Sequence, residues 1–326
     1  MKETIIKENE SGQRLDKYLK KYLPQAPGSF IYKMLRKKNI TLNGKKAAGQ
    51  EKLNTGDSIK FFLAEETIDK FTGNAAASES YPVKKDLEII YEDDNILLIN
   101  KPAGMLSQKS KKEDVSLVEY VIGYLLSNGS VTKEELLTFH PGICNRLDRN
   151  TSGMVVAGKS LAGLQIMGEA FKERTLAKYY LCLVKGCIKE TSHIRGYLKK
   201  DEKTNKVMIS RKMSEGAAAI ETEYEPVAYQ KELTLLKVHL ITGRTHQIRA
   251  HLASIGHPIA GDYKYGNRSF NDALKKKYGL RSQLLHAYRL EFPENCEGDI
   301  KQLSGKILKA PVPALFEQIC KAQGVM

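Results

Sequence analysis

The segment that sets the fold class reads Glu88-Ile89-Ile90-Tyr91-Glu92-Asp93-Asp94-Asn95-Ile96-Leu97-Leu98-Ile99-Asn100. Two runs of strand-forming residues flank three polar residues that are typical of a turn, so the segment predicts two paired strands. Lys101-Pro102-Ala103-Gly104-Met105 then ends the second strand, because Pro lacks a backbone N–H and Gly favours turns.

Similar patterns recur along the rest of the chain, without βαβ alternation or a Gly-rich phosphate loop. Strand-like composition occurs at 154–157, 179–184, 218–226 and 233–241, and helical spacing occurs at 115–126 and 161–171. We therefore expect residues 87–326 to form an α+β domain with a mixed, mostly antiparallel sheet rather than a doubly wound one.

The first 66 residues predict a small separate α/β domain. Apolar residues have helical spacing over 12–23 and 28–38, an Asn43-Gly44 turn signal lies between strand-like residues, and 57–62 predicts another strand. From Ala64 the periodicity is lost, and we interpret 67–86 as a flexible linker.

The charge of the chain favours a polyanionic partner. The 326 residues contain 52 Lys and Arg against 38 Asp and Glu, a formal charge of +14. Residues 1–63 alone contain 14 basic and 6 acidic side chains, a surplus of 8, so more than half of the excess lies in the first fifth of the chain. A basic surface that only maintains solubility explains a general excess but not a local one, so we expect nucleic acid to bind here.

Composition excludes several other classes. The apolar share of 41% and charged share of 28% are typical of a soluble globular protein. The charged N-terminus does not resemble a signal peptide, and no apolar run reaches the roughly 20 residues that span a bilayer. Five Cys without a C-x-x-C pair indicate reduced thiols rather than disulfides or zinc ligands. We expect a cytoplasmic protein without membrane contact, metal or cofactor.

The chemically most informative loop is Asn145-Arg146-Leu147-Asp148-Arg149-Asn150-Thr151-Ser152-Gly153. It places one carboxylate between two guanidiniums, which favour the ionised form that acts as nucleophile or base. Taken alone, such a loop is more often a surface salt-bridge network than an active site. Whether the loop belongs to an active site therefore has to be judged together with the other motifs.

The N-terminal region resembles the S4 RNA-binding domain. The resemblance lies in G-x-R-L-D-K-Y-L from Gly12, N-G-K in the turn at Asn43, and N-T-G-D from Asn54. A basic helical pair of this size could instead bind a protein. The side chains that the resemblance and the charge pattern assign to RNA binding are Arg14, Lys17, Lys33, Arg36, Lys37, Lys38, Lys45 and Lys46.

Four segments in order resemble the RluA-type pseudouridine synthases, a family that includes enzymes of large-subunit ribosomal RNA. They are N-K-P-A-G-M at 100–105, R-L-D-R-N-T-S-G at 146–153, K-Y-Y-L-C-L-V-K-G at 178–186 and T-G-R-T-H-Q-I-R-A-H at 242–251. The family usually has His before R-L-D, where this chain has Asn145. We interpret this difference as an adjustment of packing or RNA contact.

The resemblance implies roles for individual residues. Asp148 resembles the catalytic aspartate, Tyr180 the active-site tyrosine and Arg249 the charged partner of the aspartate. Arg146 resembles the side chain that replaces the extruded base, because a planar cation can take over its stacking. The remaining residues assigned to substrate binding are Arg149, Thr151, Arg244, Thr245, His246 and Gln247.

The implied reaction breaks C1′–N1 of uridine and forms C1′–C5, which requires no cofactor. The carboxylate could attack C1′, add at C6 or remove a proton at C2′, and all three alternatives stay open. The implied partner is large-subunit ribosomal RNA or a preribosomal particle, with a monomer favoured. The main alternative is a noncatalytic RNA-binding or ribosome-assembly protein. A zinc deaminase is excluded, because H-x-E and P-C-x-x-C are missing from the sequence.

Overall fold

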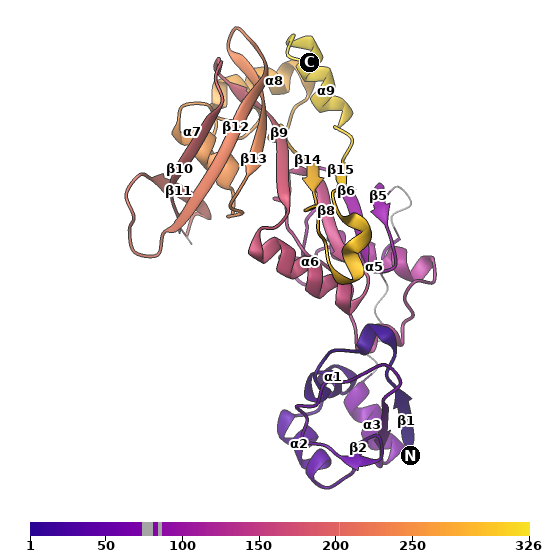
Figure 1. Cartoon of the computed structure of the whole chain (residues 1–326). Coiled ribbons are helices and arrows are strands. Elements are labelled where there is room, and N and C mark those ends of the chain that lie inside the picture. Colours follow the sequence, from indigo (N-terminus) through magenta and orange to yellow (C-terminus); the bar gives the residue numbers. More distant parts are fainter. Residues whose placement is uncertain (74–80, 84–86, 202) are drawn as a thin grey trace.

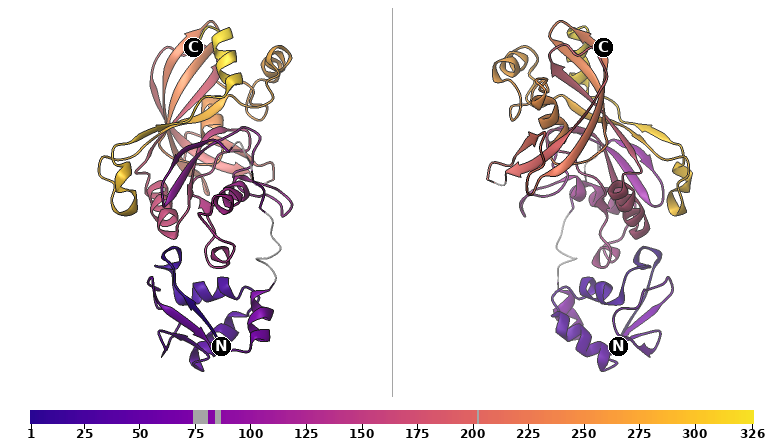
Figure 2. Two further views of the ribbon diagram at one scale, coloured as in Figure 1. Left: turned by 90° about the vertical axis from the view of Figure 1, so that its right-hand side faces the viewer. Right: turned by 60° about the vertical axis from the view of Figure 1, so that its left-hand side comes forward.

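The computed structural model describes residues 1–73, 81–83, 87–201 and 203–326. These residues form two sheets, one of four strands in the order β1-β4-β2-β3 and one of 11 strands. Figure 1 shows the first sheet in a small N-terminal unit below the body that contains the second. Both views of Figure 2 show the same separation.

The N-terminal unit packs helices against its four-stranded sheet. Its strands are β1 (Lys2–Ile5), β2 (Ile40–Leu42), β3 (Lys45–Lys46) and β4 (Ser58–Phe61), and its helices are α1 (Leu15–Tyr22), α2 (Gly28–Arg36) and α3 (Glu65–Thr72). Asn43 and Gly44 have φ of 50° and 73°, as expected for a tight hairpin between β2 and β3. The buried faces of α1 and α2 form one core with the sheet.

Helix α3 corrects the expected start of the linker. Ile68 is buried, and the Phe71 ring lies 4.5 Å from that of Phe30, so residues 65–72 belong to the N-terminal core. The helix is only two turns long and has too few apolar residues to produce a clear period, which is why the sequence suggested irregular structure. The rest of the predicted linker includes 74–80 and 84–86, which lie outside the described residues. Strand β1 was also not predicted, because it is a charged edge strand.

The large sheet is mixed and mostly antiparallel, which confirms the predicted fold class. Its strand order is β11-β10-β12-β13-β9-β14-β8-β6-β5; β14 and β8 run parallel, and the other described pairs run antiparallel. The bounds are β5 Ile89–Glu92, β6 Ile96–Lys101, β8 Ser152–Gly158, β9 Ala177–Lys185, β10 Ser192–Asp201, β11 Lys206–Ser210, β12 Ala218–Gln230, β13 Leu233–Leu240 and β14 Leu285–Glu291. Two short strands, β7 (Gly142–Ile143) and β15 (Ile307–Lys309), pair with β8 and β14.

Helices cover both faces of this sheet, so its central strands are apolar on both sides. Leu97 and Ile99 of β6 pack in the core with α5, whereas Ile96 and Leu98 pack in the core with α6. The helices are α5 Leu117–Ser127, α6 Leu161–Glu173, α7 Gln247–Ser254, α8 Arg268–Tyr278 and α9 Ala314–Ala322. The predicted helices at 115–126 and 161–171 are therefore confirmed, while the sequence did not indicate α8 and α9.

Side-chain alternation along β9 divides its residues between the two faces of the sheet. Tyr180, Cys182 and Val184 pack with α5 and α7, whereas Leu181 and Leu183 pack with α8 and α9. A shift of register by one residue would place Tyr180 on the opposite face.

The N-terminal unit contacts the larger body through a short 3-10 helix, η1 (Glu8–Glu10). The Thr138 hydroxyl donates to the buried Glu10 carboxylate, and Lys7 Nζ lies 3.2 Å from Glu135 of η2 (Glu135–Leu137). Among the described helices, none is long and apolar enough to cross a membrane.

Candidate active site

A cleft of about 1060 Å³ lies over the middle of the large sheet. Its lining comes from the loop before β8, from Tyr180 of β9 and from the segment 243–249 at the start of α7. These segments are far apart in the sequence, and each contains one of the predicted catalytic residues Asp148, Tyr180 and Arg249. The structure therefore brings the three together.

The loop that contains Asp148 is fixed by the segment 101–107. Arg149 O accepts from Gly104 N at 2.8 Å and from Lys101 Nζ at 3.2 Å, and Ser107 Oγ donates to Leu147 O at 2.8 Å. Lys101 is fully buried, and burial lowers its pKa to about 8 against the opposing effect of the Asp148 charge. Residues of the N-K-P-A-G-M motif thus orient the loop that carries Asp148.

Gly153 allows β8 to approach β14 directly after this loop. Its φ is +113°, and a Cβ would lie 2.3 Å from Ala287 O and 2.5 Å from Ala287 N. Any side chain here would separate the parallel pair that β8 forms with β14. Gly153 therefore allows the two strands of the sheet to pair, while Asp148, earlier in the same motif, lines the cleft.

Arg249 binds two carboxylates at once. Its Nη1 donates to Asp148 Oδ2 at 2.7 Å, while Nε and Nη2 donate to the Asp262 carboxylate at 2.7 and 3.0 Å. The Asp262 side chain is 1% exposed and that of Asp148 is 25% exposed. Asp262 therefore anchors the guanidinium, which fixes the direction of the accessible carboxylate.

Arg249 keeps its positive charge although its side chain is buried. Burial opposes the charged form, but the hydrogen bonds and charges of Asp262 and Asp148 outweigh it and raise the pKa of Arg249. The Tyr265 ring centroid lies 5.3 Å from the guanidinium carbon and adds a cation–π contact. The sequence did not indicate Asp262 or Tyr265, because no local pattern links the turn at 261–266 to Arg249.

Tyr180 borders the cleft from its floor and is 8% exposed. Burial raises the pKa of its hydroxyl, and the nearby charge of Asp148 raises it further. The hydroxyl therefore stays protonated at neutral pH, and its ring offers a flat apolar surface next to the carboxylate.

His246 lies beside the carboxylate at the entrance to α7. Its Nε2 is 3.8 Å from Asp148 Oδ2, and its Nδ1 is 2.9 Å from the Tyr265 hydroxyl. Burial lowers the pKa of His246, with the Asp148 charge in opposition. Of the other predicted substrate contacts, Arg146, Arg149, Arg244 and Thr245 line the cleft.

Thr151 and Gln247 also border the cleft, and their assignment to substrate binding stays a prediction. Each is 2% exposed. The Gln247 amide donates to Glu221 O and Thr222 Oγ1 and accepts from Thr242 Oγ1, and Thr151 N donates to Asp148 O. Both residues are therefore held in place within the cleft wall, with little of either side chain exposed.

Asn145 occupies the position where His is usual. Its side-chain Oδ1 accepts from Val156 N at 2.8 Å, and its Nδ2 donates to Met154 O at 3.3 Å. The amide thus bonds to the edge of β8 as a neighbouring strand would, which is consistent with a packing function.

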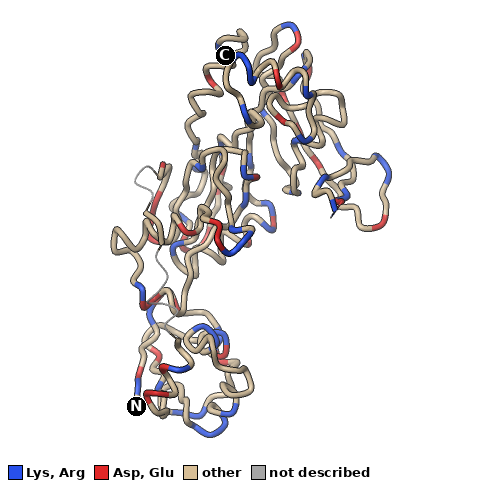
Figure 3. The backbone as a smooth tube through the Cα atoms, turned by 180° about the vertical axis from the view of Figure 1, so that it is seen from behind, with Lys and Arg blue, Asp and Glu red and all other residues tan. Residues whose placement is uncertain are grey.

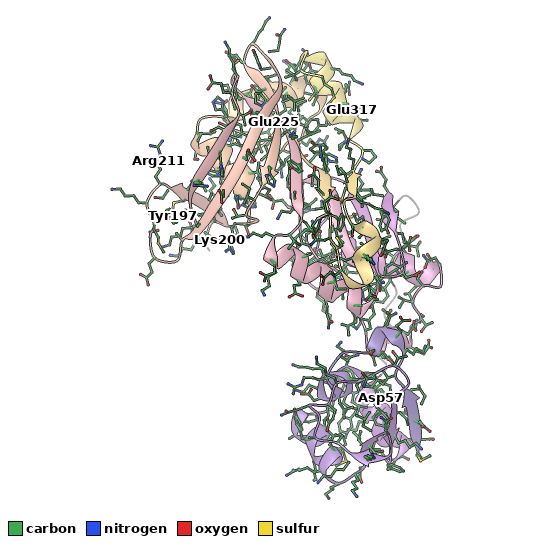
Figure 4. The ribbon with its side chains drawn as sticks, viewed as in Figure 1. Asp57, Tyr197, Lys200, Arg211, Glu225 and Glu317 are labelled. Carbon is green, nitrogen blue, oxygen red and sulfur yellow. The ribbon has the colours of Figure 1, made fainter. Side chains whose placement is uncertain are left out.

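A basic rim that the sequence did not single out borders the cleft on two sides. Lys172, Arg174 and Lys178 come from the end of α6 and the start of β9, and Lys200 comes from β10. In Figure 4, Lys200 lies on the side of β10 that faces α6, whereas Arg211 lies on the outer side. The sequence separates these residues widely, so their common rim depends on the fold.

The basic residues predicted in the N-terminal unit are surface residues. All eight, from Arg14 to Lys46, are exposed, although Arg14 is bonded to Asp16 at 3.0 Å. Figure 3 shows Lys and Arg recurring along this unit.

Other reactive groups contribute no additional chemistry to this region. Burial raises the pKa of Cys144 to about 12, so its thiol stays protonated at neutral pH and is a packed group rather than a nucleophile. Within the described ranges, no group of three or more His, Cys, Asp and Glu side chains could hold a metal ion.

Comparisons with known proteins agree on one family. Residues 95–254 match the family model of RNA pseudouridylate synthase. The chain is 35% identical over 298 residues to an uncharacterised RNA pseudouridine synthase of Mycoplasma genitalium, covering 89% of this chain and 88% of that protein. It is 32% identical over 301 residues to ribosomal large subunit pseudouridine synthase C of Vibrio parahaemolyticus, covering 90% and 89%.

A solved structure has the same fold. Human RNA pseudouridylate synthase domain containing 4 superposes with a TM-score of 0.58 at 23% identity, covering 73% of this chain and 94% of that one. The sequence relatives cover most of both chains, and the resemblance that the motifs indicated is confirmed. The chain therefore belongs to the RNA pseudouridine synthases, the isomerases that convert uridine to pseudouridine in RNA.

Proposed function

We propose that this enzyme isomerises uridine in large-subunit ribosomal RNA, with Asp148 as the reacting acid. The observation that carries the assignment of Asp148 is the chain of contacts Asp148–Arg249–Asp262, which orients a partly exposed carboxylate into a cleft. The large-subunit substrate is supported by relatives that are named for it and align over about nine-tenths of the chain.

The geometry suits a flipped nucleoside. Arg249 binds Oδ2 of Asp148, and within the described part of the chain Oδ1 has no protein hydrogen-bond partner, so it is the oxygen offered to the substrate. The Tyr180 ring borders the same space and can pack on uracil. Exposed Arg146 lies at the mouth of the cleft, where its planar cation can fill the place of the extruded base.

The reaction keeps every atom of uridine except one exchanged proton. The C1′–N1 bond breaks, the uracil turns in the cleft, C1′–C5 forms, and the proton on C5 is lost while N1 gains one. Attack at C1′, addition at C6 and proton removal at C2′ all require Oδ1 to reach the nucleoside, and they remain alternatives for Asp148.

The N-terminal unit is proposed as an S4-like RNA-binding domain that supplies affinity. Eight exposed basic side chains, two helices and a hairpin in 1–73 support this role. We further propose that the enzyme acts as a monomer in the cytoplasm, on ribosomal RNA that is naked or in an assembling particle.

Mapping of pseudouridine tests the substrate. Ribosomal RNA from cells with and without the gene is compared, and we expect one or more large-subunit pseudouridines to disappear with the gene and to return with a wild-type copy but not with an Asp148→Asn copy. Unchanged large-subunit RNA together with a missing site in another RNA would refute the proposed substrate.

A further inference from the structure

Tyr265 connects the cleft to the β10–β11 hairpin through a single oxygen. Val207 N donates to Tyr265 Oη at 2.9 Å, and His246 Nδ1 lies 2.9 Å from the same oxygen. The backbone N–H of Val207 can only donate, so it occupies the acceptor position of the hydroxyl. Because the oxygen already accepts this bond, its single proton is available to His246 Nδ1, and donation in that direction avoids two N–H groups facing one oxygen.

This arrangement decides which nitrogen of His246 carries a proton. A neutral imidazole that accepts at Nδ1 carries its proton on Nε2. Nε2 is the atom that faces Asp148, at 3.8 Å from Oδ2. The backbone of His246 has φ of 53°, a left-handed conformation that directs the ring into the cleft just before α7 begins.

We propose that Tyr265 is a positioning residue that keeps His246 neutral with its proton on Nε2, directed at Asp148. This inference rests on the proposed role of Asp148. At 3.8 Å from Oδ2 the neutral Nε2–H forms no hydrogen bond, but it directs a partial positive charge at the carboxylate beside Arg249. A protonated His246 would instead add a second full positive charge, which would make the carboxylate a weaker nucleophile or base.

The surrounding charges agree with a neutral imidazole. Burial has the largest effect on His246, and the charges of Arg249 and Lys264 also lower its pKa; Asp148 and Asp262 raise it but do not reverse the direction. A hydroxyl that donates to Nδ1 favours the neutral imidazole as well, because a hydrogen bond to the neutral form disfavours the charged one. If His246 took a proton on Nδ1, two N–H groups would compete for one oxygen, and the hydroxyl would have to turn away.

The variant Tyr265→Phe removes this oxygen and keeps the ring that faces Arg249. We expect the acid limb of kcat at saturating RNA to move to higher pH, because the neutral imidazole loses the bond that favours it. RNA affinity should be unchanged.

Tyr263→Phe is the matched control, because the Tyr263 side chain is exposed and its hydroxyl is hydrogen-bonded to Asp272 at 3.0 Å rather than to His246. Activity is measured as tritium release from a large-subunit ribosomal RNA transcript labelled at uridine C5.

Nitrogen-15 NMR of the histidine-labelled full chain tests the proton directly and needs no RNA. The His246 signals are assigned by their loss in His246→Gln, and in the wild type we expect a protonated Nε2 and an unprotonated Nδ1 at neutral pH. A proton on Nδ1 in the wild type, or an acid limb that does not move in Tyr265→Phe, would overturn the proposal. Wild-type protein that releases no tritium while its His246 shows the expected form would count against the substrate instead.

Discussion

The N-terminal unit and the cleft are both basic, but they differ in how their positive charges are held. In residues 1–73 the lysines and arginines lie on an exposed surface, where water and salt screen them. In the cleft, the Arg249 side chain is 9% exposed and bound by two carboxylates. The difference fits the proposed division of tasks, in which exposed charge would supply salt-dependent affinity for RNA and the buried charge of Arg249 fixes the direction of the Asp148 carboxylate.

The two regions also differ in how they respond to pH. Residues 1–73 contain no histidine, whereas the body contains all seven. Two of these, His251 and His286, are 2% and 0% exposed, and burial lowers the pKa of each to about 4. Mild acid should therefore lower the free energy of unfolding of the larger body more than that of the N-terminal unit.

The largest effect is expected from Asp148→Asn. The substitution removes the reacting carboxylate but preserves shape, so turnover should fall by at least about 10²–10⁴-fold. RNA affinity should change little, because the basic surfaces are intact. Tritium release and a filter-binding titration measure the two quantities, and substantial residual turnover would contradict the assignment.

Asp262→Asn tests whether Asp262 holds the buried Arg249 guanidinium in place. Breaking a buried ion pair on one side leaves Arg249 incompletely paired, which should lower the free energy of unfolding by about 3–5 kcal/mol. Turnover should fall with it, because Arg249 loses the group that fixes its direction. Urea unfolding measures the first effect. Asp272→Asn, on an exposed carboxylate of the nearby α8, is the control and should leave both values near wild type.

The pH dependence of unfolding separates the two regions. Unfolded histidine has a pKa near 6.5, so below that pH the unfolded chain binds the proton that buried His251 and His286 resist. Stability is fully present above about pH 6.5 and should decrease by up to about 1.4 kcal/mol per pH unit for each histidine, down to about pH 4.

Chemical unfolding between pH 6.5 and 5 measures this slope without interference from most carboxylates. His286→Asn should reduce it, and exposed His193→Gln should not. A slope that is unaffected by His286→Asn would show that the buried ring is not its source.

The smallest effect is expected from single lysines of the N-terminal unit. Lys33→Gln or Lys37→Gln should reduce the dependence of log K on log salt by about 0.7–0.9 for each phosphate that the protein no longer neutralises, with kcat unchanged at saturating RNA. Lys276→Gln on α8 is the control, because it removes an exposed charge outside the cleft lining. If all three changed the slope equally, the N-terminal unit would not be the preferred RNA surface.

Much of the secondary structure was predictable because its signals are local. The strand-forming run that predicts β6 and the apolar spacing that predicts α6 depend on neighbouring residues only, and the structure confirms both elements. Helix α3 was missed because Ile68 and Phe71 alone make its apolar face, and their meaning depends on the core that they enter.

The order of residues along the chain was enough to predict the family and the fold class, which are confirmed, and to locate the excess of charge near the N-terminus. It also singled out Asp148, Tyr180 and Arg249 as candidates, and all three line one cleft. The folded molecule was needed to show that Arg249 is anchored by Asp262, that Thr151 and Gln247 are almost fully buried in the cleft wall, and that Tyr265 contacts His246. The difference arises from how far apart the interacting residues lie in the sequence. Periodicity and motifs record interactions between residues close in the chain, whereas these contacts form when β8, β9 and α7 meet and their side chains exclude water.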